Sequence, residues 1–138
     1  MVKIKAAVCH KFGAPLQIET INLREPLTGE VEVTLGAVAV CHSDISFAAG
    51  DWGGELPAVY GHEAAGFVSK TGNAVKGFEI GDRVVVTLIK SCGNCNNCLE
   101  GNPTICEANN LAILPILSAE NKTIQQAMNC GAFAEKVV

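Results

Sequence analysis

The most informative stretch of the sequence reads Gly61-His62-Glu63-Ala64-Ala65-Gly66 and continues into Phe67-Val68-Ser69-Lys70. A strand is predicted over 66–70, before the turn-rich segment 71–82, and it begins soon after a histidine–carboxylate pair. Upstream, residues 30–35 alternate polar and apolar side chains, and this period of two is typical of a half-buried strand. The centre of the chain is therefore expected to be β-structure with titratable groups beside a strand end.

Short strands separated by turns are also predicted along the rest of the chain. The turn at Gly13-Ala14-Pro15 separates the first two, and 71–82 is rich in turn residues. Ser43 is expected to cap a short helix through Ala49 that ends at Gly50. The further strands are expected at 2–9, 16–21, 83–89 and 132–138. Many short strands without a strand–helix alternation favour a mainly β barrel or sandwich.

Length and composition exclude several classes of protein. The 138 residues suit one domain, and 49% hydrophobic against 17% charged residues indicates a globular chain. A net charge of −4 leaves no basic stripe, so nucleic acid is not an expected partner. No apolar run approaches the roughly 18–20 residues of a membrane span. The apolar part of the first twelve residues is too short for a signal peptide, so we expect a cytoplasmic protein.

Four cysteines form a dense lobe over 91–107. Cys92, Cys95, Cys98 and Cys106 give the spacing C-x2-C-x2-C-x7-C, which suits a tetrahedral, closed, structural zinc site. An iron–sulfur cluster is the rival, but there the fourth cysteine follows after three residues and precedes proline. Here the gap is seven residues and Glu107 follows.

The other cysteines differ in context. Seven cysteines are an odd number for a disulfide framework, and without a signal peptide metal ligation is the better interpretation. Cys9 and Cys130 are expected to be small buried hydrophobes. The run Cys41-His42-Ser43-Asp44 follows a strand, and with His62-Glu63 it suggests one thiolate and one imidazole at strand ends with carboxylates nearby.

These motifs together resemble the zinc-dependent medium-chain alcohol dehydrogenase family. The glycine-bounded 61–66 run, Gly72, Val75, the run 81–84 and the four-cysteine lobe occur in the family's order, and the resemblance covers essentially the whole chain. It implies a mainly β, GroES-like, partly open β-barrel with short helices and a zinc-binding loop lobe. Residues 1–138 would form this catalytic domain, incomplete and without the nucleotide-binding domain. Quinone reductases share the fold but lack both zinc sites, so they fit poorly.

The resemblance also implies roles for the site residues. Cys41 and His62 would be two of the three protein ligands of a catalytic zinc. Ser43 would take the alcohol proton, Asp44 would orient His62, and Glu63 would be the acid that approaches the metal during ligand exchange.

Three further positions follow from the same resemblance. His42 falls where the family carries a basic residue that contacts the cofactor pyrophosphate. Trp52 and Leu88 match positions that line the substrate pocket, although Trp52 is equally expected as a core or interface aromatic. Many members end the proton relay in a histidine at the position of Ser46, so here the proton would leave through the ribose and water alone, or leave more slowly.

The functional expectation is the oxidation of an alcohol to an aldehyde or ketone with NAD(P) in the complete enzyme. The third ligand and the nucleotide-binding domain are expected downstream of Val138, so this chain alone is expected to be inactive. An open sheet edge at Val137-Val138 is expected to make it a homo-oligomer. The alternatives are a standalone non-catalytic zinc-binding module, such as the partner of a separate nucleotide-binding domain, and a metal-buffering or redox protein. A buffer has no need of Ser43, which favours enzymatic ancestry.

Overall fold

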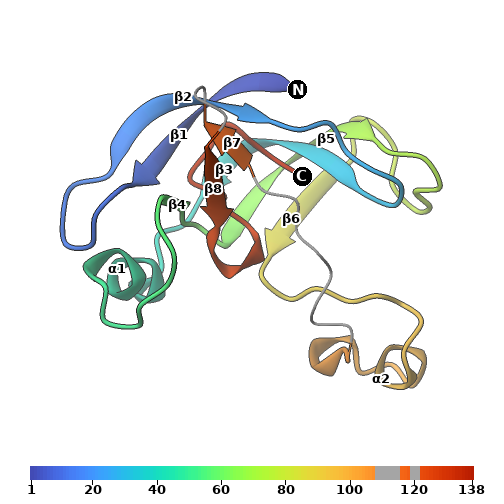
Figure 1. The fold of residues 1–138 in the computed structure, drawn as a ribbon. Helices are drawn as coiled ribbons and strands as arrows, with labels where there is room; N and C mark the ends of the chain where they lie inside the picture. Colours follow the sequence, from blue (N-terminus) through green and yellow to red (C-terminus); the bar gives the residue numbers. More distant parts are fainter. Residues whose placement is uncertain (108–115, 119–121) are drawn as a thin grey trace.

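The structure is a computed structural model that describes residues 1–107, 116–118 and 122–138. Its strands form a closed barrel in the order β1-β2-β7-β8-β4 and an open sheet in the order β6-β5-β3-β9 (Figure 1). The barrel strands are β1 (Val2–Cys9), β2 (Gln17–Leu23), β4 (Ala58–Val59), β7 (Ile116–Ser118) and β8 (Thr123–Gln126). The open sheet consists of β3 (Val31–Val38), β5 (Glu63–Thr71), β6 (Arg83–Thr87) and β9 (Lys136–Val137). The predicted mainly β class is confirmed. The predicted partly open barrel is confirmed too, since one set of strands closes and the other remains an open sheet.

The barrel core follows from alternation along β1 and β2. These strands pair antiparallel from Val2 opposite Leu23 to Val8 opposite Gln17, so every second β1 side chain points inward. The inward set is fully or almost fully buried and consists of Ile4, Ala6, Val8, Ile21, Leu23, Val59 and Ile124.

The open sheet carries the strand that follows His62. β5 pairs with β3 on one side and with β6 on the other, where Glu63 lies opposite Thr87. This pairing extends β5 to Glu63–Thr71, beyond the predicted 66–70. β6 ends at Thr87 rather than at the predicted residue 89, because its pairing with β5 ends at Thr87.

Helix α1 (His42–Ala49) begins earlier than predicted. Its N-cap is Cys41, not Ser43, because the Asp44 carboxylate accepts a hydrogen bond from the Cys41 backbone N–H at 3.0 Å. The predicted end is confirmed: Gly50 has a φ of 93° and its N–H donates to the carbonyls of Ser46 and Phe47.

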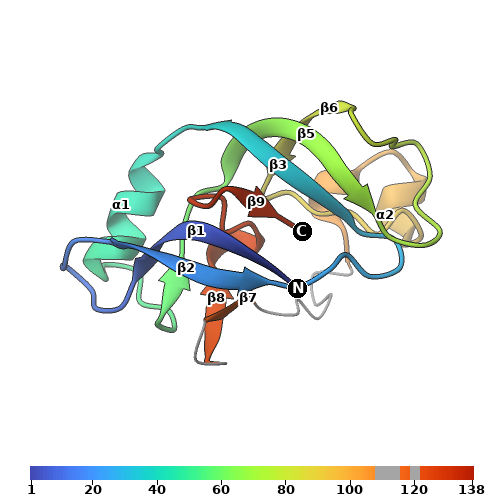
Figure 2. The same ribbon diagram turned by 90° about the horizontal axis from the view of Figure 1, so that it is seen from above.

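The short helices lie near the end of the barrel or in the cysteine lobe. They are α2 (Asn96–Leu99), η1 (Pro103–Ile105) and η2 (Ala127–Asn129). α1 and α2 lie at opposite ends of the molecule (Figures 1 and 2). In the part of the chain that the structure describes, the helices are too short, or too polar, to span a bilayer.

The last segment of the chain joins the two sheets. Phe133 accepts a hydrogen bond from the Ala7 N–H at 2.8 Å, while Glu135 donates to Lys5 and accepts from Leu35, both at 3.0 Å. β9 therefore lies between β3 and the β1–β2 hairpin (Figure 2). The predicted strand over 132–138 is shortened to Lys136–Val137, because residues 133–135 are shared between β1 and β3 instead of running along one neighbour.

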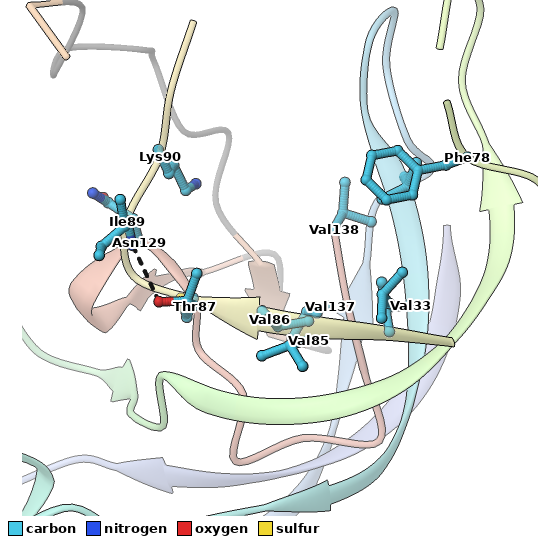
Figure 3. Close-up of a pocket in the computed structure, with 13 residues that line it drawn as sticks. Val33, Phe78, Val85, Val86, Thr87, Ile89, Lys90, Asn129, Val137 and Val138 are labelled. Atoms are coloured by element: carbon cyan, nitrogen blue, oxygen red, sulfur yellow. Dashed lines mark hydrogen bonds between the residues drawn. The ribbon is translucent and has the colours of Figure 1, made fainter. Parts of the chain in front are cut away.

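The sheet edge expected at Val137-Val138 is only partly open. Val137 pairs with Val33 and is 3% exposed. The opposite terminal strand, β6, is the more exposed edge, with Val85 at 77%. Val33, Val86 and Val137 line one open apolar groove of about 270 Å³ on this sheet (Figure 3).

Candidate metal centres

The first candidate centre lies where α1 meets the start of β5. Cys41 is the N-cap of α1, and His62 and Glu63 lie on the connection from β4 into β5. One possible ligand atom from each of the three lies within 4.8 Å of the other two. The structure thus brings together the thiol, the imidazole and one of the carboxylates that the sequence analysis singled out.

The buried Asp44 carboxylate connects the residues of this centre through hydrogen bonds. The residue is 2% exposed, and its Oδ1 accepts hydrogen bonds from the Gly61 N–H at 2.9 Å and from His62 Nδ1 at 3.2 Å. Its Oδ2 accepts the Cys41 N–H. A proton on Nδ1 facing Asp44 leaves the Nε2 lone pair of His62 free to bind a metal. Two of the three candidate ligand residues, Cys41 and His62, are therefore anchored by one carboxylate.

Polar groups surround the free nitrogen of His62. The Ser43 Oγ lies 3.4 Å from His62 Nε2, and Glu63 Oε1 lies 3.9 Å from the same atom. His62 is 4% exposed, whereas Glu63 is exposed, so the centre opens toward solvent on the Glu63 side. An open groove of about 380 Å³, lined by His62, Glu63, Ala64 and Thr87, lies beside the centre along the sheet.

The remaining predicted residues lie on α1 or outside the centre. His42 is exposed at the first position of α1, and Ser46, at 8% exposure, is buried one turn after Ser43. Trp52 packs edge to face against Phe47 with ring centroids 5.0 Å apart. At 60% exposure Trp52 is not a core residue, and Leu88 is 44% exposed just beyond β6.

The second candidate centre is the cysteine lobe. One sulfur from each of Cys92, Cys95, Cys98 and Cys106 lies within 4.8 Å of the other three. The Cys95 and Cys106 sulfurs are 3.9 Å apart, and the thiols are free rather than paired as disulfides. Cys106 is 3% exposed and faces inward from the end of η1.

Backbone N–H groups aimed at the sulfurs shift their acidity. The N–H groups of Glu107 and Cys98 lower the pKa of Cys95 to about 6, and those of Asn94 and Cys95 lower the pKa of Cys92. Burial, together with the neighbouring Cys95, raises the pKa of Cys98 to about 11. Donors converging on sulfur stabilise thiolates, the form that binds metals.

Cys9 and Cys130 lie outside both centres, as predicted. They are 1% and 3% exposed, and burial raises the pKa of Cys130. Both act as small core residues.

Sequence reasoning missed one contact that bears on the first centre. Ala132 and Phe133 donate backbone hydrogen bonds to the carbonyls of Gly61 and Tyr60 at 2.9 and 2.8 Å. The two segments are far apart in sequence, so no local pattern could reveal this contact.

Comparison with known proteins agrees with this architecture. Residues 28–138 match the family model described as the alcohol dehydrogenase GroES-like domain. An alcohol dehydrogenase of Moraxella sp. (strain TAE123) is 42% identical over 108 residues, which cover 76% of this chain and 32% of that protein. The chain thus spans about a third of the length of this curated relative.

Two solved structures extend the likeness over 99% of the chain and 39% of theirs. One is an alcohol dehydrogenase zinc-binding domain protein from Burkholderia ambifaria, with 31% identity and a TM-score of 0.88. The other is a cobalt- and zinc-bound thermostable alcohol dehydrogenase from Pyrobaculum aerophilum, with 29% identity and a TM-score of 0.75. On the family match and these likenesses, the chain belongs to the alcohol dehydrogenase GroES-like domain family.

Proposed function

We propose that this chain supplies the metal-binding half of the active site of a zinc-dependent alcohol dehydrogenase. The complete protein would move a hydride between a primary or secondary alcohol and NAD(P), giving an aldehyde or ketone. The observation that carries the proposal is the grouping of Cys41, His62 and Glu63 within 4.8 Å, with Asp44 on the far nitrogen of His62.

The donor set of this centre fits zinc. A thiolate, an imidazole nitrogen and a carboxylate are all zinc ligands, and a carboxylate behind the histidine is its usual support. When bound, zinc supplies Lewis acidity that favours deprotonation of an alcohol. Cys41 and His62 are proposed as ligands, with Glu63 close enough to join them.

Ser43 is the proposed first acceptor of the alcohol proton. Its Oγ lies 3.4 Å from His62 Nε2, beside the position at which the ligand atoms converge. A hydroxyl accepts one hydrogen bond and donates another, so it can pass a proton onward. Ser46, one turn further along α1, is buried and is not a base, so the proton would continue to the cofactor ribose or to water.

The cofactor and substrate contacts are also proposals. The sequence contains no Gly-x-Gly-x-x-Gly run, so we assign no dinucleotide turn and no hydride step to these residues. His42, exposed at the first turn of α1, would contact the cofactor pyrophosphate. Trp52 and Leu88, both exposed, would border the alcohol.

The lobe over 91–107 is proposed to hold a structural zinc. Its four sulfurs saturate a tetrahedron and leave no position for substrate. Binding energy at such a site is folding energy for a lobe whose only described helices are α2 and η1.

Metal analysis tests the proposal. The purified chain should bind two zinc ions; Cys41→Ala should retain one and Cys106→Ala should retain the other. Cys9→Ala, which alters a buried cysteine away from both centres, is the matched control and should retain both. Two zinc ions retained in Cys41→Ala would contradict the assignment.

An activity assay tests whether this chain alone is catalytic. The 138-residue chain, with zinc, NAD or NADP and a panel of alcohols, should show no turnover. Nothing in it is proposed to hold the nicotinamide, and orientation of reactants supplies roughly 7–11 kcal/mol of a rate enhancement. Turnover that Cys41→Ala abolishes would show that these residues suffice.

We also infer self-association and a cytoplasmic location. The terminal strand β6 presents Val85, and the neighbouring Phe67 is 49% exposed, which leaves an apolar edge that a second copy can cover. The free thiols suit a reducing compartment. A monomer in light scattering at high concentration would refute the first inference, and recovery from an oxidising compartment would refute the second.

A further inference from the structure

We propose that Gly61, held by the backbone of Ala132 and Phe133, is a positioning residue that fixes the His62 imidazole for metal binding. The inference rests on the metal centre proposed above. Gly61, Ala132 and Phe133 supply no metal ligand in this proposal. They act through the backbone one position before His62.

Both backbone groups of Gly61 are occupied. Its N–H donates to Asp44 Oδ1 at 2.9 Å, on the α1 side. Its carbonyl accepts the Ala132 N–H at 2.9 Å, on the side of the segment that leads to β9. The residue is buried, so these bonds are shielded from water. The backbone that leads into His62 is therefore held by hydrogen bonds on two sides.

The contact is too close for any side chain at this position. A Cβ on Gly61 would lie 2.6 Å from Phe133 Cδ1, 2.7 Å from the Phe133 nitrogen and 3.0 Å from the Ala132 carbonyl carbon. Two of these atoms are backbone and cannot rotate away. The φ of 92° adds strain for any residue other than glycine. A substitution must therefore move one of the two segments.

Movement of this backbone would be felt at the metal. His62 Nδ1 lies 3.2 Å from Asp44 Oδ1, already at the long end of a hydrogen bond, so a small displacement breaks it. Metal–ligand distances lie within about 0.2 Å of their usual values, so a ligand atom that moves further binds poorly. The segment 132–133 thus acts on the distance between the His62 nitrogen and the Cys41 sulfur through the backbone of Gly61.

The first test is Co²⁺ titration after one equivalent of zinc has filled the four-cysteine lobe. Gly61→Ala should weaken Co²⁺ binding at the first centre by about tenfold or more and alter the visible d–d spectrum, as loss of a supporting contact does. Gly53→Ala is the matched control, because Gly53 also has a positive φ, 70°, but a methyl group added there would meet no atom within 4 Å. It should leave affinity and spectrum unchanged, whatever its effect on stability.

The second test needs no destabilised variant. In the wild-type chain, Co²⁺ at the first centre should slow amide hydrogen exchange at Ala132 and Phe133, because linkage makes the coupling reciprocal. Cys41→Ala should lose that protection. The inference would be overturned if Gly61→Ala bound Co²⁺ with the affinity and spectrum of the wild type. It would also be overturned if Co²⁺ left hydrogen exchange at the Ala132 and Phe133 amides unchanged. Neither result would contradict the metal centre itself. Absence of a Co²⁺ site that depends on Cys41 would overturn the proposed function, and this inference with it.

Discussion

Replacement of Asp44 by alanine should destabilise the chain by about 4 kcal/mol. The carboxylate is 2% exposed and accepts three hydrogen bonds, from Cys41, Gly61 and His62. A single hydrogen bond to a charged group contributes roughly 1.5–3 kcal/mol, but contributions within one network do not add. Loss of one partner from a buried charged network costs roughly 3–5 kcal/mol, which sets the expected value.

Asp44→Asn should cost less, about 2 kcal/mol. Asparagine keeps one carbonyl oxygen for Gly61 and His62 but turns an NH₂ group toward the Cys41 N–H, so chiefly the bond to the N-cap is lost. Guanidinium unfolding at pH 7, followed by circular dichroism, measures both values. Asp51→Ala, an exposed acid just after α1, is the control and should change stability by less than about 0.5 kcal/mol. A loss below about 1 kcal/mol in Asp44→Ala, or equal losses in both variants, would refute the idea that one carboxylate anchors the centre.

Three more outcomes are expected. Cys95→Ser should lower the zinc content by one ion and leave X-ray absorption without a four-sulfur shell near 2.3 Å, whereas iron–sulfur absorption in the wild type would contradict a zinc lobe. Glu32→Gln should cost about 2 kcal/mol at pH 7, since Glu32 is 0% exposed and accepts a 2.7 Å bond from Lys136 Nζ. Burial raises the pKa of Glu32, but the hydrogen bonds from Lys136 and Ser69 outweigh burial and lower the pKa below 4.5. This stabilisation is therefore present above pH 4.5 and disappears as the pH falls through the lower pKa of the folded state. The difference in unfolding free energy between the wild type and Glu32→Gln should shrink in acid, and a difference that stays constant with pH would contradict this reasoning. Val85→Lys, in the exposed β6 edge, should shift light scattering toward monomer, and unchanged scattering would place the contact elsewhere.

Local patterns predicted most of the longer strands. The predicted strands at 30–35 and 66–70 correspond to parts of β3 and β5. Buried and more exposed residues alternate along the start of β5, whereas in β3 the polar Glu32 is buried together with Val33, so the expected half-buried pattern at 30–35 is wrong at Glu32. The two-residue β4 was missed, since so short a strand has no period of its own. Its parallel pairing with β8 is a property of the tertiary structure alone.

The candidate centres differ in how far the sequence predicted them. The cysteine lobe was predictable because its four sulfurs lie within one short segment, and the fold needs only to close a loop. The first centre joins the start of α1 to the start of β5, so the sequence identified its members but not their geometry. The choice of Cys41 over Ser43 as N-cap depended on which way the Asp44 side chain turns, which no spacing rule fixes.

The shared pairing of residues 133–135 has a consequence for how the chain folds. These residues close long loops, since they bond to Lys5 and Ala7 in β1 and to Leu35 in β3. Such contacts repay the entropy of ordering only after everything between them is in place, which makes them slow to form. The β1–β2 hairpin can form early from neighbouring residues, whereas the backbone contacts to Gly61 can be completed only when residues 132–135 dock. Competence to bind metal at the first centre is therefore expected to appear only after this slow docking of residues 132–135.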